Sequence, residues 1–177
     1  MTSTVLILGA RSDIARATAH AFAAKGYSIW LAGRNVDELK SDCQDLQIRF
    51  GVQAAAYGVD ALKIETHEAF AAELPGVPDI AVCAIGLMGD QSESEVTVAA
   101  MAKVMRSNFE GPASLLAIFA NRMLARGSGT LVGISSVAGL RGRASNYVYG
   151  AAKAGFTAFL SGLRNRMAHN RTGVQVI

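Results

Sequence analysis

Residues 4–15, TVLILGARSDIA, join a short apolar run to a glycine and then to residues that start helices. The run 4–8 has the length and the continuous apolarity of a strand that is buried on both faces of a parallel sheet. Gly9 suits a tight turn, and Ser12 and Asp13 are residue types that begin a helix. The stretch therefore predicts a strand, a tight turn and a helix in succession.

The same alternation continues along the chain. Short apolar runs predict further strands at residues 28–32, 52–59, 79–84, 130–134 and 174–177. Apolar residues at helical spacing predict helices at residues 14–25, 39–50, 64–74, 93–126 and 146–169. We expect residues 93–126 to form two helices, because Gly111 and Pro112 interrupt the ladder near Asn108. In the first helix, the predicted buried face carries Ile14, Ala17, Ala21 and Phe22.

Alternating strands and helices predict an α/β fold. We expect a Rossmann-like, doubly wound parallel sheet with strand order 3-2-1-4-5-6 and helices on both faces. Residues 1–177 are expected to form a single domain with one sizeable core. In such a fold, ligands bind at the carboxyl ends of the strands. The polar and glycine residues that follow predicted strands are therefore the candidate functional residues: Gly9, Arg34, Asp60, Gly86 and Ser136.

Composition excludes several classes of protein. Charged residues make up 18% of the chain and its net charge is +3, with the basic residues scattered, so a nucleic-acid partner is not expected. No apolar run is long enough to span a membrane, and we expect a cytoplasmic protein. Two cysteines provide neither a disulfide framework nor metal-ligand spacing. The isolated histidines, His20, His67 and His169, are predicted to be solvated or helix-face residues, so no metal site is expected.

The turn at residues 9–15 is a candidate phosphate site. Free amides at a helix start bind anions, and glycine lets the backbone approach a pyrophosphate closely. Asp13 is expected to be repulsive there unless its carboxylate turns away. Arg11 either contacts a phosphate or forms a surface pair with Asp13. Arg34 follows the second strand, where an acidic residue would favour NAD(H), so we expect NADP(H) unless Arg34 is merely a solvated loop residue.

Tyr149 and Lys153 are candidates for acid–base chemistry. Their spacing of four places them on one helix face, one turn apart. An ammonium at that distance stabilises the phenolate, which makes the phenol a better proton donor. A tyrosine and a lysine four apart also occur by chance, so the pair depends on the residues around it.

In this order, the residues resemble the short-chain dehydrogenase/reductase family, in its compact single-domain branch. The resemblance implies the catalytic residues Asn108, Ser136, Tyr149 and Lys153. It implies the cofactor-binding residues Gly9, Arg11, Ser12, Asp13, Ile14, Arg34, Asp60, Ala84, Gly86, Tyr149 and Lys153. The sequence departs from the family pattern at Asp13 and Ala15, where the family has glycines, and at residues 83–85, where it has Asn-Asn-Ala.

The resemblance also implies roles. Tyr149 would exchange a proton with the substrate oxygen, Lys153 would bind the nicotinamide ribose, and Ser136 would polarise the carbonyl. Asn108 would hold a water that connects Lys153 to solvent, and Asp60 would approach the adenine. Family spacing selects Ser136 and leaves Ser135 as a structural residue.

The expected protein is thus an NADP(H)-dependent oxidoreductase that interconverts a carbonyl and a secondary alcohol. The alternative is a catalytically idle nucleotide-binding or sensor protein of the same fold. Relatives continue past a sixth strand into a substrate lid and a last strand, so we expect this chain to lack those segments. The small-molecule substrate is not identified. The helices that begin near Asn108 and Tyr149 are expected to pair in a homodimer or homotetramer.

Overall fold

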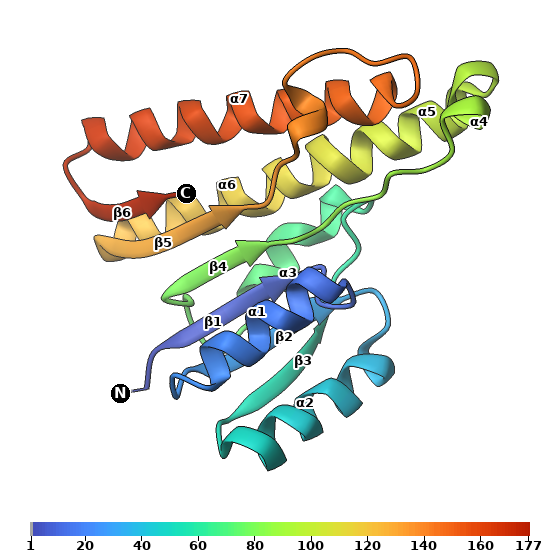
Figure 1. Cartoon of the computed structure of the whole chain (residues 1–177). Helices are drawn as coiled ribbons and strands as arrows, with labels where there is room; N and C mark the ends of the chain where they lie inside the picture. Colours follow the sequence, from blue (N-terminus) through green and yellow to red (C-terminus); the bar gives the residue numbers. More distant parts are fainter. Residues whose placement is uncertain (1) are drawn as a thin grey trace.

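Six parallel strands form the central sheet of the structure, a computed structural model that describes residues 2–177 (Figure 1). The strands are β1 (Thr4–Leu8), β2 (Ser28–Gly33), β3 (Ala54–Gly58), β4 (Ile80–Cys83), β5 (Ser128–Gly133) and β6 (Gly173–Val176). Their spatial order is β3-β2-β1-β4-β5-β6, and every pairing is parallel. The predicted strand order is therefore confirmed.

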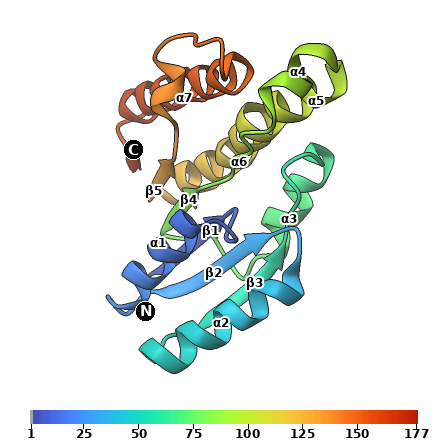
Figure 2. The ribbon, with the colours of Figure 1, turned by 45° about the vertical axis from the view of Figure 1, so that its right-hand side comes forward.

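Helices cover both faces of this sheet, as Figures 1 and 2 show. One face packs against α1 (Asp13–Ala23) and α2 (Val36–Phe50), and the other packs against α3 (His67–Glu73), α6 (Gly111–Arg126) and α7 (Tyr147–His169). Two shorter helices, α4 (Gln91–Val96) and α5 (Val98–Met105), precede α6, and 3₁₀ turns span Ile64–Thr66 and Val137–Gly139. The doubly wound architecture follows from this alternation of layers.

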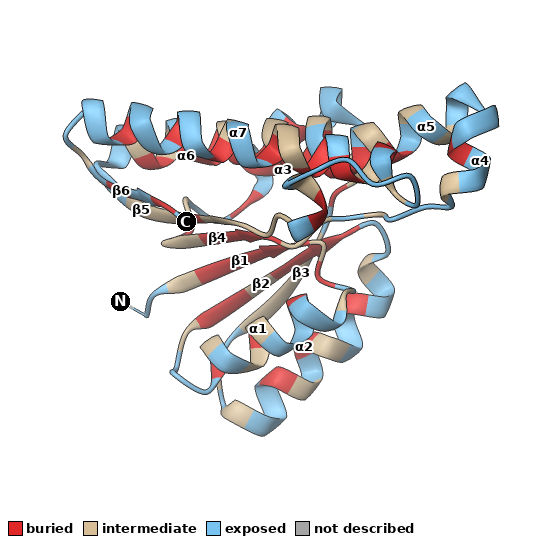
Figure 3. Ribbon diagram, turned by 45° about the horizontal axis from the view of Figure 1, so that its top comes forward, coloured by how far each residue is buried: buried red, intermediate tan, exposed pale blue. Residues whose placement is uncertain are grey.

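β1 carries both halves of the hydrophobic core. Leu6 and Leu8 belong to the cluster that includes α3, α6 and α7, whereas Val5 and Ile7 belong to the cluster that includes α1 and α2. All four side chains are fully buried, because successive residues of a strand point to opposite faces of the sheet. Figure 3 shows the buried strands between the two layers of helices. Burial on both faces explains why the run is apolar at every position after Thr4.

The buried face of α1 differs from the predicted one. Ala15, Ala19 and Ala23 are buried against the sheet. The predicted residues Ile14, Ala17 and Ala21 are exposed, and Phe22 is half-buried. Three alanines at four-residue spacing let the helix lie close to β1 and β2, whereas the prediction followed the larger side chains.

Residues 106–110 correct the predicted break between two helices. Arg106–Glu110 form a π-helical turn that joins α5 directly to α6. The amide of Gly111 donates to the carbonyl of Arg106, five residues earlier, and Pro112 has no N–H to continue an α-helical ladder. A wider turn accommodates the proline ring without ending the helix.

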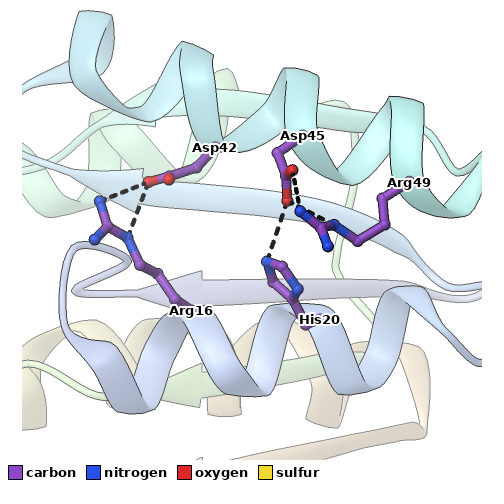
Figure 4. Close-up of polar contacts among 5 residues, drawn as sticks. All are labelled: Arg16, His20, Asp42, Asp45 and Arg49. Atoms are coloured by element: carbon purple, nitrogen blue, oxygen red, sulfur yellow. Dashed lines mark hydrogen bonds and ion pairs between the residues drawn. The ribbon is translucent and has the colours of Figure 1, made fainter.

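Ion pairs link α1 to α2 on the outer surface (Figure 4). Arg16 lies 3.3 Å from Asp42, and His20 lies 3.4 Å from Asp45, which also accepts from Arg49 at 2.8 Å. The hydrogen bond from Arg49 lowers the pKa of Asp45 below its ordinary value. Such exposed ion pairs contribute little to the free energy of unfolding. We therefore infer that their role is to align α1 with α2.

In the described part of the chain, residues 2–177, no helix is both long and apolar enough to cross a bilayer. Cys43 and Cys83 are buried free thiols. Over the same residues, no group of three or more His, Cys, Asp or Glu side chains is arranged to hold a metal ion.

Candidate active site

The carboxyl ends of the strands open into a cleft of about 790 Å³. Leu8 lies level with Ala32 of β2 and Cys83 of β4 in the sheet, so the residues after these strands emerge at one edge. Seven predicted cofactor-binding residues line the cleft: Gly9, Arg11, Ser12, Arg34, Asp60, Ala84 and Gly86. The other four predicted residues lie outside its lining: Asp13, Ile14, Tyr149 and Lys153.

Gly9 is required by the turn that follows β1. Its φ is +80°, and a Cβ at this position would lie 2.9 Å from the backbone of Ile85. The amides of Gly9 and Ala10 both donate to the carbonyl of Ala32, at 2.9 and 3.1 Å. The turn is therefore fixed to the ends of β2 and β4, where the cleft begins.

The start of α1, where Arg11 and Ser12 line the cleft, has free backbone amides. Ser12 is the N-cap, and its hydroxyl accepts from the Ala15 amide at 3.1 Å. The amides of Arg11, Asp13 and Ile14 have no hydrogen-bond partner within residues 2–177. Unpartnered amides at a helix start form a site for an anion, and the helix dipole favours negative charge there.

The two departures from the glycine pattern are accommodated differently. Ala15 is fully buried, so its methyl group packs in the core beside β1. Asp13 is exposed in the first turn of α1, and its carboxylate does not line the cleft. Neither side chain occupies the space beside the turn.

Arg11 forms an ion pair with Glu38. The interpretation that Arg11 forms a surface pair with Asp13 is therefore wrong. Glu38 lies in the first turn of α2, lines the cleft and also accepts a hydrogen bond from Asn35. Sequence analysis missed Glu38, because an acidic residue in a first helical turn is expected from the helix dipole alone. The cleft thus holds a carboxylate close to its cationic side chains.

Arg34 follows the end of β2 and lines the cleft as an exposed side chain. Across the described residues it forms no ion pair within 4.0 Å. Lys103 of α5 lines the cleft from another side and is likewise without an acidic partner there. Both cations are free to meet an anionic ligand.

Further residues that sequence analysis missed complete the lining: Ala10, Gly33, Asn35, Val59, Ala61, Leu62, Ile85, Leu87, Lys103 and Ser107. Most of these residues are next in sequence to a predicted site residue, so their position after a strand could have indicated that they line the cleft. Lys103 and Ser107 lie on a helix and had no such signal in the sequence.

Ser135 and Ser136 have different surroundings. The Ser135 hydroxyl donates to the carbonyl of Lys153 at 3.1 Å and lies 2.6 Å from the Thr157 hydroxyl. The Ser136 hydroxyl accepts from the Ala138 amide at 3.2 Å, at the start of the 3₁₀ turn Val137–Gly139. Ser135 is therefore bound to α7, whereas the hydroxyl proton of Ser136 remains free for another acceptor.

Two glycines bring this 3₁₀ turn against α7. A Cβ on Gly139 would lie 2.7 Å from the Ala154 amide nitrogen, and a Cβ on Gly150 would lie 2.7 Å from the Ala138 carbonyl oxygen. Real side chains do not pack this tightly, so backbone meets backbone here. The contact places the turn after Ser136 against the helix that carries Tyr149 and Lys153.

Lys153 is 3% exposed and connects α7 to the ends of two strands. Its Nζ donates to the carbonyls of Ile134 at 3.0 Å and Ile85 at 3.5 Å, and it lies 5.9 Å from the centre of the Tyr149 ring. Burial lowers the pKa of Lys153 below its ordinary value, and Cys83 opposes this shift. The structure therefore brings a buried ammonium and the phenol ring to the same place.

Asn108 is fully buried in the π-helical turn. Its amide nitrogen donates to the carbonyls of Leu87 at 2.6 Å and Val104 at 2.8 Å, and its oxygen accepts from the Leu87 amide at 3.1 Å. A Cβ on Gly86 would lie 3.3 Å from the Asn108 oxygen and 3.6 Å from Lys153 Nζ. Asn108 thus fixes the backbone at Leu87, and both of its amide protons are already donated.

At the start of α7, Asn146 has a buried Oδ1 without a hydrogen-bond partner among the residues described. It is the residue before the helix, three positions from Tyr149. A buried amide oxygen usually has a donor, so this atom is an exception within the described residues.

Comparisons with known proteins agree with this geometry. The family model for short chain dehydrogenases matches residues 3–177. An uncharacterized oxidoreductase of Mycobacterium tuberculosis is 36% identical over 176 residues, which are 98% of this chain and 70% of that protein.

Two solved structures match closely in fold. An actinorhodin polyketide ketoreductase variant with NADPH has a TM-score of 0.89 and 26% identity, covering 99% of this chain and 68% of its own. A short-chain dehydrogenase from Sphingobium yanoikuyae in complex with NADPH has a TM-score of 0.88 and 26% identity, covering 98% and 68%.

Proposed function

Since the chain belongs to the short-chain dehydrogenase family and is an oxidoreductase, we propose that it interconverts a carbonyl and a secondary alcohol with NADP(H). The observation that carries the proposal is the joint placement of Tyr149, Lys153 and the Ser136 turn. Glycines hold that turn against α7, and Lys153 reaches from α7 to Ile85 at the edge of the cleft.

The residues of the cleft fit a dinucleotide. Its volume of about 790 Å³ suits a large ligand, and the free amides at the start of α1 suit a pyrophosphate. Arg11, Ser12, Asp13 and Ile14 would hold the phosphates, the last two through backbone amides, and Gly9 would let the backbone come close to them. Asp60, Ala84 and Gly86 would form the walls. When bound, the nicotinamide supplies or accepts the hydride.

The chain's own residues perform the proton chemistry. Tyr149 donates its proton to the carbonyl oxygen in reduction and takes it back in oxidation. Lys153, whose Nζ lies 5.9 Å from the centre of the Tyr149 ring, would stabilise the phenolate by its positive charge and would hold the nicotinamide ribose hydroxyls. The Ser136 hydroxyl donates a hydrogen bond to the carbonyl oxygen, which polarises the carbonyl, and keeps its proton. Asn108 holds the backbone of Leu87 in place.

NADP(H) is favoured because Arg34 lines the cleft and forms no ion pair within residues 2–177. A guanidinium suits a 2′-phosphate, which it binds through two parallel hydrogen bonds. Glu38 opposes this preference, since its carboxylate repels a phosphate. Its pairing with Arg11 offsets part of that repulsion.

The first prediction concerns Tyr149, whose loss separates chemistry from binding. Tyr149→Phe is expected to lower turnover by at least about 10²-fold because the proton donor is lost, while NADPH binding is unchanged. Steady-state reduction of a panel of ketones and aldehydes gives the turnover, and fluorescence titration gives the affinity. Tyr147→Phe is the matched control, since Tyr147 has no lysine one turn later. Near-normal turnover by Tyr149→Phe would refute the mechanism.

The same measurements distinguish the alternative, an idle nucleotide-binding or sensor protein. Such a protein would bind NADPH and reduce no member of the panel. The inward packing of Ala15 and the outward position of Asp13 remove two of the reasons for considering it.

A further inference from the structure

His67 corrects the prediction of a solvated or helix-face histidine. Its side chain is fully buried, with Nε2 3.0 Å from the Asp60 carbonyl oxygen and Nδ1 3.0 Å from the Ser114 hydroxyl. A carbonyl oxygen only accepts, so Nε2 donates to Asp60. In the neutral ring, Nδ1 then accepts the proton of Ser114. The proposed chemistry uses neither nitrogen.

The bond from His67 fixes a turn of the cleft wall, residues 60–62. The Asp60 carboxylate accepts from the Leu62 amide at 3.0 Å, and the Asp60 carbonyl accepts from the Lys63 amide at 3.0 Å. His67 is therefore the second donor to that carbonyl and the one that comes from a helix. Without it, the turn keeps hydrogen bonds to itself and loses its connection to α3.

The opposite side of the turn rests on the helix that carries Asn108. Arg106 donates to the Leu62 carbonyl at 2.9 Å. A Cβ on Gly111 would lie 2.2 Å from the Ala61 carbonyl oxygen, so the turn lies directly on the backbone at the start of α6. Ser114 lies one turn further along α6, which means that His67 links α3, the turn and α6 at one point.

We propose that His67 is a positioning residue for the adenosine half of the cofactor: by binding the Asp60 carbonyl from inside the core, it holds residues 60–62 where they line the cleft. The inference rests on the proposed function for the identity of the ligand. His67 does not touch the ligand, and its effect passes through the backbone of the turn.

Fragments of the cofactor test this directly. Adenosine 2′,5′-bisphosphate carries the adenosine half and reduced nicotinamide mononucleotide carries the other. His67→Leu removes both hydrogen bonds and is expected to weaken the bisphosphate about tenfold, while the mononucleotide changes less than about twofold. His67→Gln keeps a donor and an acceptor at similar positions and is expected to restore bisphosphate affinity to within about threefold of wild type. His169→Leu, an exposed histidine, is the matched control.

Hydrogen exchange of the ligand-free protein tests the turn itself. Amides of residues 59–66 are expected to exchange faster in His67→Leu than in wild type, and those of β4 to exchange equally in both. Unchanged exchange in the turn, unchanged bisphosphate affinity or an equal loss of both fragments would overturn the inference. If His67→Leu does not fold, Ser114→Ala replaces it, with an expected loss of about threefold for the bisphosphate alone. If wild type binds neither the fragments nor NADPH, the proposed function fails, and the exchange comparison still decides whether His67 holds the turn.

Discussion

Arg34 is the side chain on which our choice of NADP(H) over NAD(H) depends. Arg34→Ala is expected to weaken NADPH binding about 10- to 100-fold, because hydrogen bonds to a charged group contribute about 1.5–3 kcal/mol. NADH has no 2′-phosphate, so its affinity should change less than about threefold. Fluorescence titration of both cofactors measures the ratio, with Arg171→Ala, at an exposed position beyond α7, as the control. Equal NADPH affinity in the Arg34 variant and wild type would remove the assignment.

Cys83 is expected to make the free energy of unfolding depend on pH in the alkaline range. Burial raises the pKa of this thiol from 9.0 to about 11, and the Ile85 amide and the Lys153 charge offset part of the shift. Between these values the unfolded chain has lost the thiol proton and the folded chain retains it. Stability is therefore fully present below about pH 9 and falls as the pH rises.

Comparison of wild type with Cys83→Ala isolates this response. From about pH 8 to about pH 10, wild type should lose about 1.4 kcal/mol more unfolding free energy than the variant. Lys153, whose lowered pKa acts in the opposite direction, is present in both proteins, so the difference between the two curves reports Cys83 together with its charge interaction with Lys153. Urea denaturation at each pH measures the difference, and parallel curves would contradict the prediction.

Single residues differed in how far the sequence revealed them. Gly9, Arg34, Asp60 and Gly86 each follow a strand, so the topology alone directs them to one edge. Glu38 was not predictable, because its position in the cleft depends on how α2 leaves the end of β2. The partners of His67 were also hidden, since Asp60 and Ser114 lie 7 and 47 residues away in the sequence.

We expect the contact between α7 and the 3₁₀ turn Val137–Gly139 to determine how Ser136 lies relative to Tyr149 in the active site. Gly150→Ala places a methyl group 2.7 Å from the Ala138 carbonyl oxygen, so the two segments must separate. We expect the free energy of unfolding to fall by about 1–3 kcal/mol, because the added methyl group overpacks the contact. We also expect turnover to fall at least about tenfold, because Ser136 moves relative to Tyr149 and small displacements of reacting groups are costly. Thermal unfolding and ketone reduction measure the two effects.

Gly162→Ala on the same helix is the matched control. Apart from the backbone of its own helix and its chain neighbours, no atom of residues 2–177 lies within 4 Å of a Cβ at Gly162, and the residue is exposed. Alanine there should stabilise α7 by about 0.5–1 kcal/mol through helix propensity and leave turnover unchanged. If both variants behaved alike, the close contact would not matter for the site.

Secondary structure was predictable where local pattern and tertiary demand agree. The strands and α2 followed their apolar patterns, with Leu39, Cys43 and Leu46 buried as expected. α1 did not, because close packing on the sheet requires alanines and leaves Ile14 exposed. The π-helical turn was read as a break, since glycine and proline mark helix ends more often than wide turns.

At the scale of the whole protein, we expect several copies of the chain to associate. Small, partly or fully exposed residues lie on α6 and α7: Ala113, Ala117, Ala154, Gly155 and Ala158. They permit close packing of these helices against a second copy, and we expect a homodimer or homotetramer. Ala158→Glu places a charge among these small residues, so its sedimentation coefficient in analytical ultracentrifugation should correspond to a smaller oligomer than that of wild type. Ile48→Glu, on the exposed side of α2, is the control and should sediment as wild type. A monomeric wild type would contradict the expectation.

The position of β1 has a consequence for the order in which the chain folds during synthesis. β1 ends at Leu8, but one of its two neighbours, β4, begins at Ile80, 72 residues later (80 − 8). At translation rates of roughly 5–20 residues per second, the edge of β1 that β4 covers waits about 4–14 s for its partner. During that interval the nascent chain exposes the unpaired backbone groups along one edge of β1, a strand that is apolar at every position after Thr4. We therefore expect slower translation across residues 9–80 to increase the aggregated fraction of newly made chains.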